Sequence, residues 1–213
     1  MRIRHSHLLA AAALFASAGN SAVHIAIPWL VLEITGSSAN AGVVLGISGF
    51  SVIFTAPIIG GLIAVLGARP VSIWADIISA GSVILFPIVG TLFGLNLASL
   101  LIIAIVGALF DPAGATARKS LIQPVAERDG LSLLKFNGTY EAAATIGTVI
   151  GPTGAAIAIG LIGINATFYV IAIVFILASC LAFFIPVVTT YVRTEESFSV
   201  GNVLNETRVG MNA

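Results

Sequence analysis

The chain has 213 residues, of which 58% are hydrophobic and 8% are charged, and its formal net charge is zero. Soluble domains carry roughly a quarter of charged residues, so this composition and a mean hydropathy of +1.11 indicate an integral membrane protein. The few, scattered basic residues exclude a nucleic-acid-binding surface. With Cys180 as the single cysteine, an internal disulfide and a multi-cysteine metal site are excluded, and we expect Cys180 to pack in the core. We expect no metal and no cofactor.

Residues 8–188 contain enough apolar sequence for six membrane-spanning helices, because each span needs about 20 apolar residues. The apolar runs are continuous, whereas the strands of a membrane β-barrel would alternate. The first run follows a short terminus, residues 1–7, and is too long for a signal peptide. We place the other spans at about 41–66, 71–93, 97–110, 133–161 and 166–188, with a solvated connection at 113–132 that could contain a short helix, and a polar tail at 189–213 that could contain an amphipathic surface helix.

The positive charges are distributed unevenly along these spans. All nine cationic residues fall on one side of the six-span arrangement, and the positive-inside rule places that side in the cytoplasm. We therefore expect a multi-pass protein of the cell membrane with both termini in the cytoplasm. The cationic residues are Arg2, Arg4, Arg69, Arg118, Lys119, Arg128, Lys135, Arg193 and Arg208.

The fifth span carries polar side chains at steps of three and four residues, which place them on one helical face. They are Asn137, Glu141, Thr145, Thr148 and Pro152. A carboxylate inside a membrane is costly unless it faces a bundle interior or a wet cavity, so Glu141 is a candidate functional residue. Gly147 and Gly151 allow close approach of a helix or a bound molecule. Alternatively, these glycines only pack helices, and Glu141 lies at the level of the cytoplasmic headgroups.

Two other spans contain candidate functional residues. Asn20 and His24 lie one helical turn apart in the first span; His24 could be a hydrogen-bonded interior residue or have a proton-linked role. Asp76 lies about two turns inside the third span and could be functional or a buried partner of Arg69, Arg118 or a helix end. The middle spans of the two triplets share a proline followed by small residues, at 57–61 and 152–156. Such traces are left by inverted repeats in transporters.

Four segments, taken together, resemble the amino-terminal half of a major facilitator superfamily transporter, closest to the bacterial drug and siderophore exporter branch. They are Gly19-Asn20 followed by AIPWLVLEITGSS, APIIGGLIAVLGARPVSIWAD, FDPAGATARKSLIQPV, and Asn137 followed by Gly151-Pro152. The resemblance implies an all-α membrane protein in which six transmembrane helices form a 3+3 inverted repeat, as half of a twelve-helix fold.

The motifs match the family pattern in part. In the loop between spans two and three, Gly60, Gly67 and Arg69 match, while Ala64 and Val65 replace an aspartate and an arginine. Asp76 matches an acidic position of span three. In span five, the antiporter-type motif is met by Gly147, Gly151 and Pro152, and Ala155 and Ala156 replace its last glycines.

The resemblance implies proton-linked export of small amphipathic, drug-like or siderophore-like molecules. Glu141 and Asp76 are the candidates for proton coupling. The chain would then need a second six-helix half, from a split gene or from a second copy. The candidates for the wall of the substrate cavity are Asn20, His24, Asn137, Thr145 and Thr148.

Two other function classes remain open. The chain could be a truncated, non-transporting fragment or an interaction subunit. Gly46-Ile47-Ser48-Gly49 has the GxSG form of the rhomboid intramembrane proteases, but no histidine follows His24 to activate Ser48. We therefore expect the protein not to be an enzyme.

Overall fold

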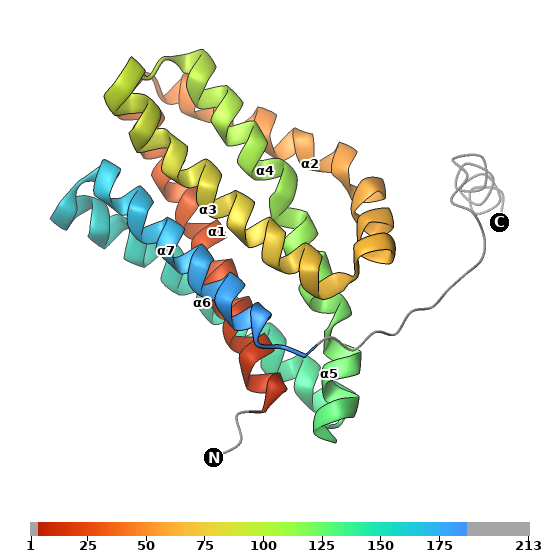
Figure 1. The fold of residues 1–213 in the computed structure, drawn as a ribbon. Helices are drawn as coiled ribbons and strands as arrows, with labels where there is room; N and C mark the ends of the chain where they lie inside the picture. The colour runs from red at the N-terminus through yellow and green to blue at the C-terminus, as the bar shows by residue number, and fades with distance from the viewer. Residues whose placement is uncertain (1–3, 187–213) are drawn as a thin grey trace, which may run out of the picture.

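The computed structural model describes residues 4–186, and only the backbone at 51–54, 56 and 57. This part of the chain folds into α-helices joined by short turns, as predicted (Figure 1). The predicted tail at 189–213, with Arg193 and Arg208, and also Arg2 lie outside the described residues. The helices are α1 (His5–Thr35), α2 (Ser38–Leu66), α3 (Ala68–Phe93), α4 (Leu97–Ser120), α5 (Ile122–Asp129), α6 (Leu133–Ile162) and α7 (Ile164–Phe183).

Within the described residues, five helices are long and apolar enough to cross a membrane. They are α1, α3, α4 with its continuation into α5, α6 and α7. Helix α2 has 29 residues, and its segment Ser38–Phe50 is a shorter apolar helix by the same measure. Many large apolar side chains on these helices are exposed, including those of Phe93 and Leu134. Such a surface suits contact with lipid and not with water.

Two expectations about local structure need correction. The segment 113–132 does contain the short helix considered from the sequence, α5, but it is otherwise not a loop, because α4 continues to Ser120 and α5 follows at once. Arg118 and Lys119 lie in the last turn of α4, where cations stabilise the negative end of the helix dipole. Cys180 is exposed and does not pack in the core, because it shares the exposed face of α7 with Ile173 and Ile176.

Glycines with positive φ end the helices at the sharp connections. Gly67, between α2 and α3, has a φ of 88°, and Gly163, between α6 and α7, has a φ of 81°. Residues other than glycine rarely adopt this backbone conformation, because their Cβ atom would clash with the backbone. The chain can therefore reverse direction within one or two residues at these two connections.

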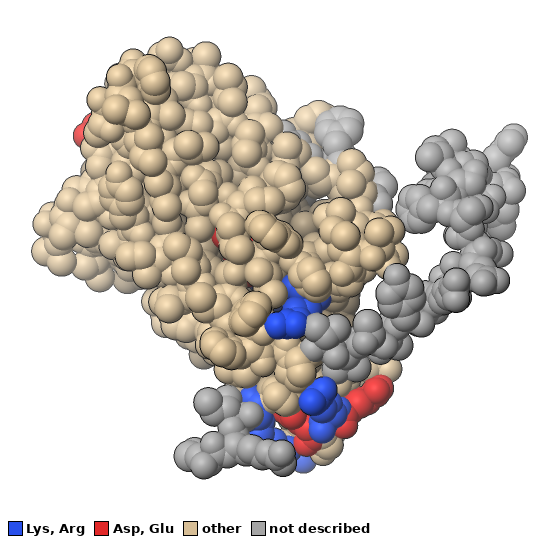
Figure 2. Space-filling view, in the orientation of Figure 1, with Lys and Arg blue, Asp and Glu red and all other residues tan. Residues whose placement is uncertain are grey.

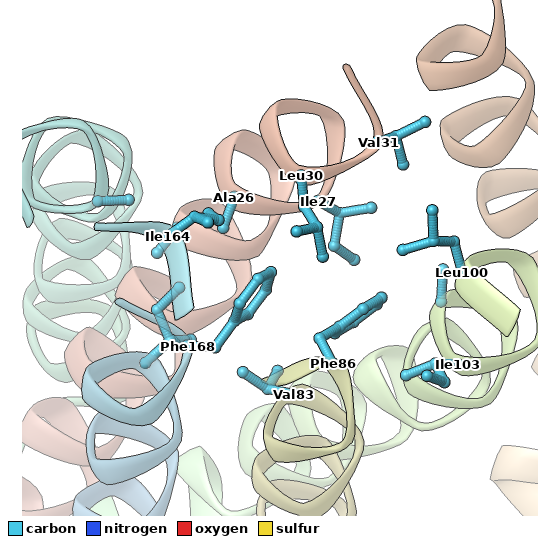
Figure 3. Packing of buried hydrophobic residues seen from close by; sticks show 14 of the residues in the cluster. Ala26, Ile27, Leu30, Val31, Val83, Phe86, Leu100, Ile103, Ile164 and Phe168 are labelled. Carbon is cyan, nitrogen blue, oxygen red and sulfur yellow. The ribbon is translucent and has the colours of Figure 1, made fainter. Parts of the chain in front are cut away.

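The largest apolar cluster joins α1, α3, α4 and α7 (Figure 3). Phe86 on α3 and Phe168 on α7 stack with ring centroids 5.0 Å apart, and Ile27 and Leu30 on α1 point into the same cluster. Leu100 and Ile103 close it from α4. This cluster fixes the positions of the helices that carry the polar residues described below.

Helices α1 and α6 cross closely at two glycines. A Cβ atom built on Gly147 would lie 2.2 Å from the backbone oxygen of Leu14, and one on Gly151 would lie 2.3 Å from that of Ala18. Both distances are impossible for real atoms, so only glycine fits at either position. The glycine pair identified in the sequence is thus a helix contact, with α1 as the helix that approaches.

Candidate functional site

A cavity of about 190 Å³ lies within the bundle, lined by α1, α2, α3, α4 and α7. Its wall is mostly apolar, with Phe86 and Phe175 as its largest side chains. Both candidates from the first span, Asn20 and His24, line it. The polar lining residues are Asn20, His24, Ser48, Ser79, Ser82 and Asp111.

Asp111 on α4 is the carboxylate of this cavity. The hydroxyl of Ser79 on α3 donates a hydrogen bond of 2.8 Å to Asp111 Oδ1. The Ser82 hydroxyl donates to the backbone oxygen of Ser79 over 2.9 Å. Across the whole of residues 4–186, no lysine, arginine or histidine lies within salt-bridge distance of Asp111. The carboxylate therefore faces the cavity with a hydroxyl partner and no countercharge in contact.

Two further polar atoms at the cavity are buried without a hydrogen-bond partner in the described part of the chain. They are Oδ1 of Asn20 and Oγ of Ser48. Leaving a buried polar atom unsatisfied costs roughly 1–3 kcal/mol, so native proteins seldom do so without a reason. Both atoms can accept a hydrogen bond from a molecule that enters the cavity.

A second group of polar contacts, which we call the charged end, consists of Arg69, Asp76, Arg118, Lys119 and Glu141. Arg118 on α4 and Asp76 on α3 form an ion pair in which Arg118 Nη1 lies 2.8 Å from both carboxylate oxygens. Each side chain of this pair is 4% exposed. The Asp76 candidate is thus the buried partner of Arg118, one of the three partners considered from the sequence.

Glu141 lies in a different environment from Asp76. Lys119 Nζ contacts Glu141 Oε1 at 3.0 Å, and the two side chains are 58% and 46% exposed. Lys119 follows Arg118 directly in the sequence, so the last turn of α4 binds α3 through one cation and α6 through the other. Glu141 does not line the cavity.

Arg69 links the start of α3 to the end of α7. Its guanidinium donates to the backbone oxygens of Ala182 and Phe183 and lies 5.2 Å from the centroid of the Phe183 ring. A cation at this position stabilises the carbonyl end of α7. The lysine, arginine and acidic side chains visible in Figure 2 gather mainly at the end of the molecule where α5 lies.

The other polar candidates on α6 are not brought to the cavity. Asn137, Thr145 and Thr148 are exposed, on a face of α6 other than the one that Gly147 and Gly151 press against α1. Asn137 lines a separate open groove together with Lys119. Pro152 lies within α6, and Gly60 lies on an exposed part of α2.

Sequence reasoning missed Asp111 and the cavity role of Ser48. Asp111 directly follows a long apolar run, 97–110. Interpreted as the end of the fourth span, it is not among the candidate functional residues predicted from the sequence. An acidic residue at the edge of such a run is itself a signal for a functional site. Ser48 and His24 line the same cavity, but Ser48 Oγ accepts and donates no hydrogen bond there, so the nucleophile–base contact of a serine hydrolase is not formed.

Comparison with known proteins identifies the family. The model of the Major Facilitator Superfamily matches residues 9–205. The multidrug efflux pump Tap of Mycolicibacterium fortuitum is 38% identical over 168 residues, which cover 78% of this chain and 41% of the relative. The multidrug efflux pump Tap of Mycobacterium tuberculosis (strain ATCC 25618 / H37Rv) is 34% identical over 171 residues, or 79% of this chain and 41% of the relative.

The chain therefore spans about two fifths of the length of these curated relatives. The match begins within α1 and includes all the helices that line the cavity. The apolar helices, the close glycine contacts and this match lead to one conclusion: the chain is a multi-pass membrane protein that belongs to the major facilitator superfamily.

Proposed function

We propose that this chain is the amino-terminal half of a proton-linked exporter of small amphipathic molecules. The observation that carries the proposal is the cavity, where Asn20, His24 and Asp111 meet inside an otherwise apolar bundle. Polar groups placed at such depth mark solute or ion pathways. The similarity to multidrug efflux pumps supports export of more than one kind of molecule.

We propose that six helices span the membrane as a 3+3 inverted repeat, with α1–α3 as one unit and α4, α6 and α7 as the other. The helix contacts support this arrangement. Helix α1 of the first unit packs on α6 and α7 of the second unit. Helix α4, which corresponds to α1, packs in the same way on α2 and α3 of the first unit. Exchange of the two units reproduces both pairs of contacts, as expected for repeats related by a twofold axis.

The charged end would face the cytoplasm. Helix α1 begins and α7 ends at the same end of the molecule as α5 (Figure 1), and the described cations at positions 69, 118 and 119 make their contacts with groups near this end. The positive-inside rule then assigns both termini to the cytoplasm.

Proton coupling would act through Glu141 and Asp76. Each carboxylate pairs with a cation in the last turn of α4. Protonation of either carboxyl group removes its negative charge and so weakens the attachment of α4 to α6 or to α3. Release of these contacts would allow the helices to rearrange when the transporter changes the side to which its cavity opens.

The partner would be a second six-helix half, from a split gene product or from a second copy of the chain. Ile146, Val149 and Ile150 on α6 and Phe50 on α2 are exposed apolar side chains. Asn137, Thr145 and Thr148 share the uncovered surface of α6. A second half packed there would enclose these polar groups in a path between the halves, with Asn20 and His24 in the cavity wall.

The test is transport by inside-out membrane vesicles that contain the protein. An imposed pH gradient should drive accumulation of a fluorescent amphipathic dye, and addition of dye should release protons from preloaded vesicles. Glu141→Gln should retain dye binding and lose the dependence on the pH gradient. If vesicles that contain the chain together with its second half accumulate no more dye than vesicles without the protein, the proposal is wrong. Unchanged coupling in Glu141→Gln removes that residue from the mechanism.

A second candidate function is a non-transporting fragment or interaction subunit. The native mass of the detergent-solubilised protein distinguishes the two. A mass of two six-helix units supports a complete transporter. A single unit that transports nothing supports the fragment.

A further inference from the structure

The cavity contains one carboxylate and two hydrogen-bond acceptors for which the described part of the chain provides no donor. Asp111 has Ser79 as its hydrogen-bond donor and no cation in contact within residues 4–186. Oδ1 of Asn20 and Oγ of Ser48 are buried and unpartnered in the same part of the chain. These three groups come from α4, α1 and α2, so they approach the cavity from three sides.

This chemistry selects for a ligand that brings hydrogen-bond donors and a positive charge. An ammonium group has three donors and no acceptor, which matches a carboxylate, an amide oxygen and a hydroxyl. A neutral hydroxyl compound could satisfy the acceptors but not the charge. An anion would be repelled by Asp111 in surroundings that screen charge poorly.

The walls and the size of the cavity limit the rest of the ligand. Val83, Phe86, Ile103 and Phe175 provide apolar contact around the polar groups. The volume of about 190 Å³ is below the roughly 300 Å³ at which drug-sized pockets begin. It therefore suits one end of an amphipathic molecule, namely an amino group with a short apolar stem, while the remainder lies outside.

We infer that Asp111 is the residue that binds the protonated amino group of a cationic amphipathic substrate, with Asn20 and Ser48 as additional hydrogen-bond acceptors. The inference rests on the proposed function for the statement that this ligand is transported. The paired carboxylates of Asp76 and Glu141 are not available for this task, since Arg118 and Lys119 occupy them. His24 on α1 is the other titratable side chain that lines the cavity in the described part of the chain.

The test is binding of dansylcadaverine to the purified protein in detergent, read from the fluorescence of the dansyl group and corrected with empty micelles. Dansylcadaverine carries a primary ammonium group on a thin alkyl chain. Its N-acetyl derivative keeps the fluorophore and the chain but lacks the charge. We expect the wild-type protein to bind the amine at least about tenfold more tightly than the acetylated compound, as a charged hydrogen bond in an apolar site implies.

Variants identify the carboxylate responsible. Asp111→Asn keeps the shape and removes the charge, and it should erase the preference for the amine. Asp111→Glu should restore part of it. Glu141→Gln, which removes a carboxylate outside the cavity, should keep it in full. A preference that persists in a folded Asp111→Asn protein overturns the inference. If Asp111→Asn does not fold, equal binding of the two compounds by the wild type or by Asp111→Glu overturns it instead.

The outcome is independent of transport. Binding that requires Asp111, in a protein whose vesicles transport nothing, supports the ligand assignment and contradicts the proposed function. Transport of dye without any preference for the amine supports the proposed function and overturns the assignment.

Discussion

Asp111 in the cavity and Asp76 at the charged end lie on neighbouring helices, but their surroundings differ in one respect. Asp76 has the guanidinium of Arg118 at 2.8 Å from each of its oxygens. Asp111 has a serine hydroxyl at 2.8 Å and an opening into the cavity. A carboxylate that pairs with a cationic side chain of a neighbouring helix holds the two helices together. A carboxylate without such a partner can bind the positive charge of a ligand.

Glu141 is intermediate between these two cases. Its partner Lys119 is close, at 3.0 Å, but both side chains are about half exposed. Water therefore weakens the attraction and can reach the carboxylate. Burial and pairing together, and not the presence of an acidic residue alone, determine what each carboxylate in the bundle can do.

The largest expected effect comes from breaking the buried ion pair. Arg118→Met leaves Asp76 without a partner at a site where each side chain is 4% exposed, and such a change typically costs about 3–5 kcal/mol. We expect a correspondingly lower free energy of unfolding in a denaturant titration of the detergent-solubilised protein. The double variant Asp76→Leu with Arg118→Met should recover most of the loss. A single variant as stable as the wild type would show that the pair is not formed.

The next effect tests the contact between α1 and α6, which lies between the two regions. Gly151→Ala places a Cβ atom 2.3 Å from the backbone oxygen of Ala18, so the helices must separate, at an expected cost of about 1–3 kcal/mol. Gly154→Ala on the same helix is the matched control, because no atom lies within 4 Å of its Cβ position. Equal unfolding temperatures for the two variants would contradict the close crossing.

The smallest effect on stability is expected at the exposed pair. Glu141→Gln and Lys119→Met should each lower the free energy of unfolding by less than about 1 kcal/mol, since solvent screens this contact. The difference from the wild type should shrink further at high salt. A loss as large as that of Arg118→Met would mean that the pair is buried in the protein as it exists in the membrane.

The sequence was sufficient for the helices and for the glycine contact, because both depend on local pattern. Apolar run length defines helices, and the spacing of Gly147 and Gly151 predicts close approach without naming α1 as the partner. Helical periodicity shows which side chains share a face, as for Asn137, Thr145 and Thr148, but not which neighbour that face meets. These residues are exposed on α6, while Asn20 and His24 reach the cavity.

The role of Asp111 could not be derived in the same way. Its environment depends on Ser79, which is 32 positions away in the sequence, and on groups from α1 and α2 that only the packing of the bundle brings near. The partners of Asp76 and Glu141 show the same limit. Arg118 was one of three possible partners for Asp76, and the contact of Lys119 with Glu141 depends on how α4 and α6 cross.

The most direct measurement is the substrate dependence of transport for Asp111→Asn and Glu141→Gln, compared in the same inside-out vesicles with and without a pH gradient. We expect Asp111→Asn to raise KM for a cationic dye and to keep the dependence of transport on the gradient. Glu141→Gln should keep KM near the wild-type value and lose that dependence. If both substitutions change the same parameter, the division of tasks between the cavity and the charged end is contradicted.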